Sequence, residues 1–170
     1  MARERHIHWY MVACGSRQSA FDDFEIALRQ HPDAFNVVLV DAEGPVTRSP
    51  WDHLQDRDHW SIRGIPDDHC HLMVQVMEAW IVADVETLQG FYGQGFNANR
   101  IPRQEDVESI AKADLEHALI QATRNTQKGE YHKIRHAPKI LALADVNKIR
   151  NRARHCERMF TILSNKIGET

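Results

Sequence analysis

The sequence predicts an α/β fold, with a parallel sheet core of about three to four strands flanked by helices and a helical C-terminal part. Short apolar runs alternate with amphipathic stretches over about residues 1–90, whereas amphipathic stretches alone fill about residues 104–170. Strands that alternate with helices are typical of parallel sheets. At 170 residues, the chain is long enough to bury a real core, so we expect a single domain over residues 1–170.

The first elements read as a strand–helix–strand unit. We expect a strand over residues 7–12, a helix capped by Ser19 that runs to about residue 30, and a second strand over residues 37–40. The run at 37–40 is continuously apolar and rich in β-branched residues, which favours a strand covered on both faces. A unit of this kind makes its two strands parallel.

The remaining elements continue the same pattern. We expect a polar loop over residues 44–68, a third strand over 71–76 and a helix that carries Met77, Trp80 and Leu88 on one face. Further helices are expected over about 107–122, 139–144 and 149–163, after a glycine-rich break at 90–95. We assign Trp9 and Trp80 to the core.

The strongest candidate site follows the strand at 37–40. Asp41 and Glu43 are two residues apart, so on an extended backbone both side chains point to the same side, and Gly44 and Pro45 then turn the chain. In open α/β sheets, ligands bind beyond the carboxyl ends of such strands. Carboxylate oxygens there suit Mg²⁺ or Mn²⁺. A solvated turn at the strand end is the alternative.

Two other groups of residues are candidates. Glu78 lies at the edge of an apolar helical stripe, where it is either functional or faces solvent. Asp84 lies on that stripe and needs a partner, which a helix cap or an ion pair would supply. Lys128, Lys133 and His136 surround a glycine turn ahead of a helix, which is either a phosphate-binding loop or a basic surface loop.

Charge and composition restrict the class of protein. Residues 1–123 hold ten basic against twenty acidic side chains, whereas residues 124–158 hold ten basic against three acidic ones. The basic block is either a phosphate-binding face or a complement to the acidic part. Three widely spaced cysteines favour a reducing, cytoplasmic location, and no apolar run is long enough to span a membrane.

Several longer motifs carry a resemblance to a known family. The chain is similar to the bacterial family called domain of unknown function 4276, which looks Toprim-like and has a Glu-x-Trp helix resembling that of RloB-like proteins. The resemblance covers nearly the whole chain and rests on the runs VDAEGPV (40–46), HLMVQ (71–75), MEAWIVAD (77–84), FYGQGF (91–96), TRNT (123–126) and KGEYHK (128–133).

The resemblance implies a site and an activity. In Toprim domains a glutamate after the first strand acts in acid–base chemistry, and a later Asp-x-Asp/Glu motif holds Mg²⁺; Asp41 and Glu43 match the later motif. Lys128, Lys133 and His136 would then hold a backbone phosphate. Relatives are expected to begin with an additional strand–helix unit that carries Val-Glu-Gly. This unit is missing here, so we expect a truncated N-terminus, an exposed strand edge and little or no catalysis. Glu78 is the candidate substitute for the missing glutamate.

The resulting hypothesis is a metal-dependent phosphodiesterase or nuclease that acts on nucleic acid in a bacterial defence or mobile-element module. It would work beside an ATPase partner, and its exposed strand edge would allow a homodimer. The alternative from another class is a non-catalytic partner or regulatory module of an ATPase. A hydrolase of small nucleotides that uses the same carboxylates is a third reading.

Overall fold

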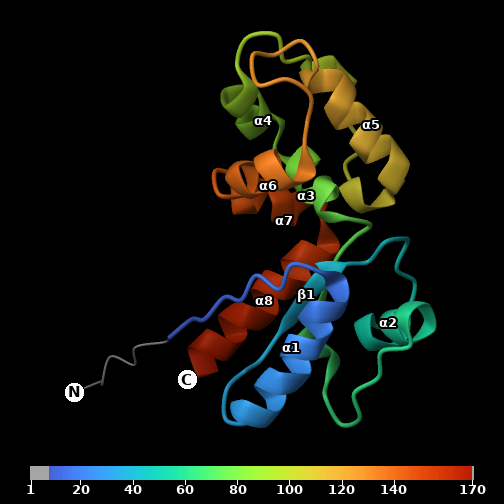
Figure 1. Cartoon of the computed structure of the whole chain (residues 1–170), viewed down its shortest axis with the longest axis vertical. Helices are drawn as coiled ribbons and strands as arrows, with labels where there is room; N and C mark the ends of the chain where they lie inside the picture. The colour runs from blue at the N-terminus through green and yellow to red at the C-terminus, as the bar shows by residue number, and fades with distance from the viewer. Residues whose placement is uncertain (1–7, 170) are drawn as a thin grey trace.

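The computed structural model describes residues 8–169 and shows a mixed α/β protein in which helices predominate. Strand β1 (Val38–Asp41) pairs in parallel with strand β2 (Cys70–Met73), so that Val38 lies opposite Cys70 and Asp41 opposite Met73. Within the described residues these two strands form the whole sheet, whereas three to four strands were expected. The helical C-terminal part is present, as the sequence predicted (Figure 1).

The expected first strand does not form in its described part. Residues 8–12 have no strand structure, and Ile7 lies outside the described residues. Trp9, expected in the core, is 61% exposed, and Met11 is 99% exposed. A strand needs a neighbour for its backbone hydrogen bonds, and residues 8–12 have no pairing partner among residues 8–169. The prediction rested on apolar composition, which says nothing about the availability of such a partner.

Helices α1 (Arg17–Gln30) and α2 (Pro50–Asp58) cover one face of the sheet. Helix α1 begins earlier than expected, because Ser16 and not Ser19 caps it. Helix α2 lies inside the expected loop at 44–68 and is started by Ser49 as N-cap and Pro50 at the first helical position. Together with the strands these helices bury the sheet core: Phe21, Phe24, Val38, Val40, Ala42, Val46, Leu54, Trp60, Cys70, Leu72 and Val74.

The other face of β1 is only partly covered, which corrects the expectation of a strand buried on both faces. Val38 and Val40 are buried, but Leu39 between them is 38% exposed. Its neighbour in the sheet, His71, is buried beneath helix α8 (Arg154–Glu169), where it contacts Arg158. The apolar run at 37–40 therefore predicted the strand correctly but overestimated its burial.

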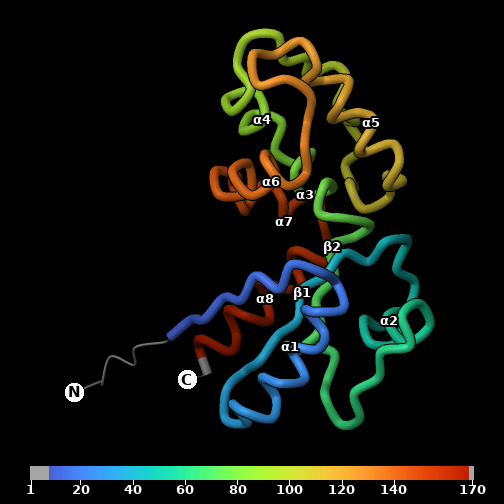
Figure 2. Tube along the Cα trace, in the orientation of Figure 1, coloured from blue at the N-terminus to red at the C-terminus, as the bar shows by residue number. Residues whose placement is uncertain are grey.

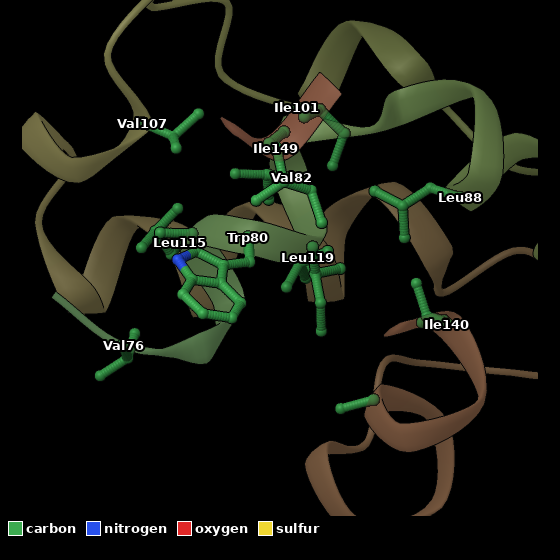
Figure 3. Packing of buried hydrophobic residues seen from close by; sticks show 14 of the residues in the cluster. Val76, Trp80, Val82, Leu88, Ile101, Val107, Leu115, Leu119, Ile140 and Ile149 are labelled. Carbon is green, nitrogen blue, oxygen red and sulfur yellow. The ribbon is translucent and has the colours of Figure 1, made fainter. Parts of the chain in front are cut away.

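Five further helices build the second part of the molecule: α3 (Met77–Ala83), α4 (Val85–Tyr92), α5 (Lys112–Thr123), α6 (Lys133–Leu141) and α7 (Val146–Arg152). Three short 3₁₀ turns, at Asp67–His69, Ala98–Arg100 and Val107–Ser109, complete the structure. Trp80 of α3, Leu119 of α5 and Ile140 of α6 meet in the helical core (Figure 3). This cluster runs from Val76 to Met159 and includes Trp80, as expected.

The two cores meet at Gln75. The sheet core ends with Val74 and the helical core begins with Val76, so the chain passes from one to the other within two residues. Helix α8 joins them, because its Cys156 and Met159 belong to the helical core while its other side packs on β2 (Figure 2). No described helix has the length and apolar character needed to cross a membrane.

Asp84 has a structural role, with both the helix cap and the ion pair that the sequence argument named. Its carboxylate is buried, caps α4 through the Thr87 N–H (3.2 Å) and accepts from the Asp145 N–H (2.9 Å). Burial alone would raise its pKa, but these hydrogen bonds and the charge of Lys148 outweigh burial and lower it. Asp84 therefore ties α4 to the start of α7.

Candidate functional site

A group of charged side chains lies where the two cores meet. Asp41 ends β1, and Glu43 follows after the fully buried Ala42. Glu78 comes from the first turn of α3, and Lys112 and Lys133 are the first residues of α5 and α6. The strand end thus supplies two carboxylates, and the helical part supplies one carboxylate and two cations.

The backbone around Asp41 is held rigidly. The Ala42 N–H donates to the Met73 carbonyl at 2.9 Å, and the Glu43 N–H donates to the Gln75 carbonyl at 2.7 Å. The Arg17 guanidinium donates to the Asp41 carbonyl and also pairs with Asp58. These bonds extend the parallel pairing of the strands beyond their ends, so the two carboxylates are attached to a fixed support.

One oxygen of Asp41 is already engaged within the protein. Its Oδ1 accepts from the Met77 N–H at 2.7 Å, which fixes the side chain against the start of α3. The second oxygen, Oδ2, lies 3.0 Å from the Lys133 ammonium. The Asp41 side chain is only 16% exposed, so its orientation is determined by these two contacts.

Glu78 is buried, not solvent-facing, and it reaches the same lysine. Its residue exposure is 4%, and its Oε2 lies 3.3 Å from the Lys133 Nζ. Its Oε1 accepts from the Tyr131 hydroxyl at 2.9 Å. Burial of Tyr131, followed by the charge of and hydrogen bond to Glu78, raises the pKa of that hydroxyl far above its usual range, so Tyr131 stays a donor.

Lys133 therefore bridges two carboxylates from different parts of the fold. Asp41 and Glu78 are 37 residues apart in sequence, yet one oxygen of each faces the same ammonium. Burial alone would lower the pKa of Lys133, but the hydrogen bonds to and charges of the two carboxylates outweigh it and raise the pKa. The side chain is still 48% exposed, so the ammonium also borders solvent.

Glu43 lies beside this bridge and has its own cation. The backbone at Glu43 is left-handed, with φ of 65°, so it does not continue the extended strand as the sequence argument assumed. Its carboxylate pairs with the Lys112 ammonium. Burial alone would raise its pKa, but the hydrogen bond from Lys112 and the charges of Lys112, Arg57 and Lys133 outweigh it and lower the pKa. Glu43 is thus held ionised within the field of Lys133.

The three residues predicted to bind phosphate have different surroundings. Lys133 contacts the carboxylates, whereas the Lys128 ammonium lies 5.1 Å from the centre of the Phe91 ring, at the edge of an open cavity of about 500 Å³. His136 is buried, and its Nδ1 accepts from the Tyr92 hydroxyl (2.9 Å) and the His132 N–H (3.1 Å). Burial first, and then nearby cations, lower the pKa of His136, which favours a neutral ring that orders the start of α6.

The sequence argument missed Tyr131, Lys112 and Arg17 as members of this group. A signal for Tyr131 was present, because it stands two residues before Lys133 in the basic loop. Lys112 gave no signal beyond its place before an amphipathic helix. Arg17 was hidden because its contacts are to a backbone carbonyl and to Asp58, 41 residues away.

The donor set is compatible with one hard divalent cation. Asp41 Oδ2 and Glu78 Oε2 already converge on a single positive charge, and carboxylate oxygens are the ligands that Mg²⁺ and Mn²⁺ prefer. Over residues 8–169 there is no cluster of three or more His, Cys, Asp or Glu side chains arranged to hold a metal. A cation held by two carboxylates would keep several waters, which is usual for Mg²⁺.

Comparison with known proteins identifies the family. Neither the curated proteins nor the solved structures give a match to this chain. The sequence profile of the family described as Domain of unknown function (DUF4276) matches residues 4–164, which is nearly the whole chain. The chain therefore belongs to the DUF4276 family.

Proposed function

We propose that this protein is a divalent-metal-dependent phosphodiesterase that acts on nucleic acid, with Mg²⁺ or Mn²⁺ held at Asp41 and Glu78 and with Glu43 beside them. The observation that carries the proposal is the convergence of the Asp41 and Glu78 carboxylates on one cation. The pair differs from the expected ligands Asp41 and Glu43, because the Glu43 carboxylate pairs with Lys112. Glu43 remains the third carboxylate of the site.

Each residue has a defined part in the proposed reaction. A bound divalent cation would polarise a phosphoryl oxygen and neutralise charge that develops during displacement. Asp41 and Glu78 would hold that cation, and the Tyr131 hydroxyl fixes the Glu78 carboxylate by donating to its Oε1. Glu43 is ionised and partly exposed, so it can accept a hydrogen bond from an attacking water.

Exposed cations on the chain segment that carries Lys133 support nucleic acid as the substrate class. The loop before α6 and the helix itself expose a series of basic side chains: Arg124, Lys128, Lys133, Arg135 and Lys139. Contacts between such side chains and phosphates supply most of the sequence-independent affinity for nucleic acid. Phosphate binding would account for the excess of basic side chains at 124–158, whereas a helix face that only contacts solvent would not need it.

The Toprim-like relation and a place in a bacterial defence module are parts of the same proposal. Two features support the relation: β1 and β2 are parallel, and the Asp41-x-Glu43 pair stands at the carboxyl end of β1. Ligands of open parallel sheets bind at this end of the strands. The resemblance of the motifs supplies the rest of the argument.

A thermal melt with and without Mn²⁺ tests the proposal. Mn²⁺ at about a hundred times its dissociation constant should stabilise the fold by about 2.7 kcal/mol. For a domain of this size, that corresponds to an increase in Tm of about 5–10 °C. Asp41→Asn and Glu78→Gln should each abolish the shift, and any nicking of supercoiled DNA or cleavage of RNA by the wild type should require both Mn²⁺ and Asp41.

Asp56→Asn is the matched control for this experiment. Asp56 is an exposed carboxylate on α2 that pairs with Arg48, so its loss should leave the Mn²⁺ shift unchanged. An unchanged shift in Asp41→Asn would contradict the proposed ligands. Metal binding without cleavage of either nucleic acid, combined with hydrolysis of free nucleotides, would move the substrate class to small nucleotides.

One observation favours the alternative of a non-catalytic partner or regulatory module of an ATPase. Trp9, Tyr10, Met11 and Val12 are consecutive and 61–99% exposed, and exposed apolar patches mark interaction surfaces. The absence of any Mn²⁺ effect, together with co-purification of an ATPase that a Trp9→Ser and Met11→Ser variant loses, would favour this reading.

A further inference from the structure

Lys133 occupies the point on which the Asp41 and Glu78 carboxylates converge. Its ammonium lies 3.0 Å from Asp41 Oδ2 and 3.3 Å from Glu78 Oε2. We propose that Lys133 is the built-in counter-cation of the site, that a divalent cation displaces it on binding, and that Lys133 thereby sets the affinity for the metal. This inference rests on the proposed function, because it assumes that a metal binds to these two carboxylates.

The two carboxylates need a positive charge between them when no metal is bound. Glu78 is 4% exposed, and a buried carboxylate without a partner is costly. Asp41 is the second negative charge on the same ammonium, so removal of the lysine would leave like charges facing each other. Lys133 meets this requirement, and for the same reason it must compete with Mn²⁺.

The geometry allows the lysine to leave while the carboxylates stay. The Lys133 side chain is 48% exposed and ends a flexible four-carbon stem at the first residue of α6. Glu78 remains fixed by the Tyr131 hydroxyl, and Asp41 remains fixed by the Met77 N–H. The two carboxylates are therefore held in place by contacts that do not depend on the lysine.

Displacement gives the ammonium a second use. A lysine that leaves the two carboxylates stays tethered beside them and faces solvent, where an anionic phosphate next to the metal can pair with it. Lys112 occupies a comparable place beside Glu43, but it contacts one carboxylate only, and its backbone N–H is also bonded to Gln75 (3.3 Å). The exchange is therefore specific to Lys133.

The test measures Mn²⁺ affinity in the full chain, by electron paramagnetic resonance of free Mn²⁺. Lys133→Gln removes the competing charge and should bind Mn²⁺ about tenfold more tightly or better, because a unit charge this close to a metal acts strongly at a partly buried site. Its metal-free form should melt below the wild type, and Mn²⁺ should raise its Tm by more. Lys139→Gln removes an exposed charge from the same helix and should change the affinity by less than about twofold.

A second measurement needs no variant. Mn²⁺ should increase the rate at which an amine-reactive reagent labels Lys133 in the wild type, measured by mass spectrometry, because the ammonium is released from its ion pairs. Labelling of Lys139 should not change. This readout remains available if Lys133→Gln does not fold.

Three results would overturn the inference, and they separate it from the proposed function. Equal or weaker Mn²⁺ binding in Lys133→Gln, with binding still lost in Asp41→Asn, would refute the counter-cation role and leave the metal site intact. Mn²⁺ binding with unchanged labelling of Lys133 would refute the displacement. No Mn²⁺ binding in the wild type or in Lys133→Gln would overturn both proposals.

Discussion

The sheet side and the helical side bury different titratable groups, although within residues 8–169 each also buries one side-chain nitrogen without a hydrogen-bond partner, His71 Nε2 and Trp80 Nε1. The helical side of the molecule buries three carboxylates, Glu78, Asp84 and Glu108, and each has several hydrogen-bond partners. The sheet side buries His71, whose Nε2 has no hydrogen-bond partner among the described residues. Buried polar groups are costly unless they are paired, so the two regions should respond differently to pH and substitution.

The three buried carboxylates of the helical side have different roles. Two of them connect separate elements: Asp84 connects α4 to α7, and Glu108 accepts from the His155 backbone N–H (2.8 Å) at the start of α8. Glu78 differs because its partner Lys133 is shared with a second, largely buried carboxylate, Asp41, whereas Lys148 is shared between Asp84 and the exposed Glu86. The proposed metal site rests on this convergence of two largely buried carboxylates on one half-exposed ammonium.

The largest expected effect comes from cutting a cavity into either core. Leu54 of the sheet core and Leu119 of the helical core are both fully buried. Leu54→Ala and Leu119→Ala should each lower the free energy of unfolding by about 2–5 kcal/mol. Because α8 packs on both cores, we expect one cooperative transition in urea and a loss of amide protection in β1 and α5 in both variants.

One result would contradict the prediction that the two cores unfold together. If Leu119→Ala lowers protection in α5 alone and leaves β1 unchanged, then the two cores unfold independently. The comparison would then concern two units and not one fold.

Much of the fold was predictable from local sequence. The apolar run before Asp41 predicted β1, and the amphipathic repeats predicted the helical part, because both signals depend on near neighbours in the chain. Helix α2 could have been found from Ser49 and Pro50, a start signal that we read as part of a loop. The strand expected at 7–12 could not be judged, since pairing depends on a partner elsewhere in the chain.

The site was predictable only in part, for the same reason. Asp41 and Glu43 stand out because they follow a buried strand directly. The contact of Glu78 with Lys133 spans 55 residues, and that of Glu43 with Lys112 spans 69. No local pattern reports such distances. Lys133 was identified as a cation for phosphate, but its place between two carboxylates follows only from the packing of α3 against α6.

The next prediction concerns two loop segments of the helical part that approach each other closely at Gly95. Gly95 has φ of +90°, and a Cβ there would lie 2.3 Å from the Asn125 carbonyl oxygen, a backbone atom. Gly95→Ala should cost about 2–4 kcal/mol, from the left-handed conformation plus the displaced loop. Gly90→Ala is the control, since nothing lies within 4 Å of its Cβ position inside α4, and it should stabilise by about 0.5–1 kcal/mol. Equal melting points for the two variants would contradict this close approach.

The last effect appears only at acidic pH, where protonation of His71 distinguishes the sheet side. Burial first, and then the charge of Arg158, lower the pKa of His71 to about 4, against the opposing influence of Asp68. In the unfolded chain, His71 binds a proton near pH 6.5, whereas in the folded protein it does so only near pH 4. The free energy of unfolding therefore falls as the pH decreases between these values.

The loss of stability that we assign to His71 can be measured by comparing the wild type with His71→Leu. At pH 4 it should amount to about 3 kcal/mol, and it should be absent in His71→Leu, which has no group to protonate. Urea unfolding of both proteins at pH 7, 5.5 and 4 measures it, since other groups titrate alike in the two. If the difference in the free energy of unfolding between the two proteins does not change with pH, then His71 binds its proton equally well in the folded and unfolded states. This would require α8 to move away from β2 and admit water. In that case the normal pKa of His71 would show that α8 does not exclude water from this face of β2.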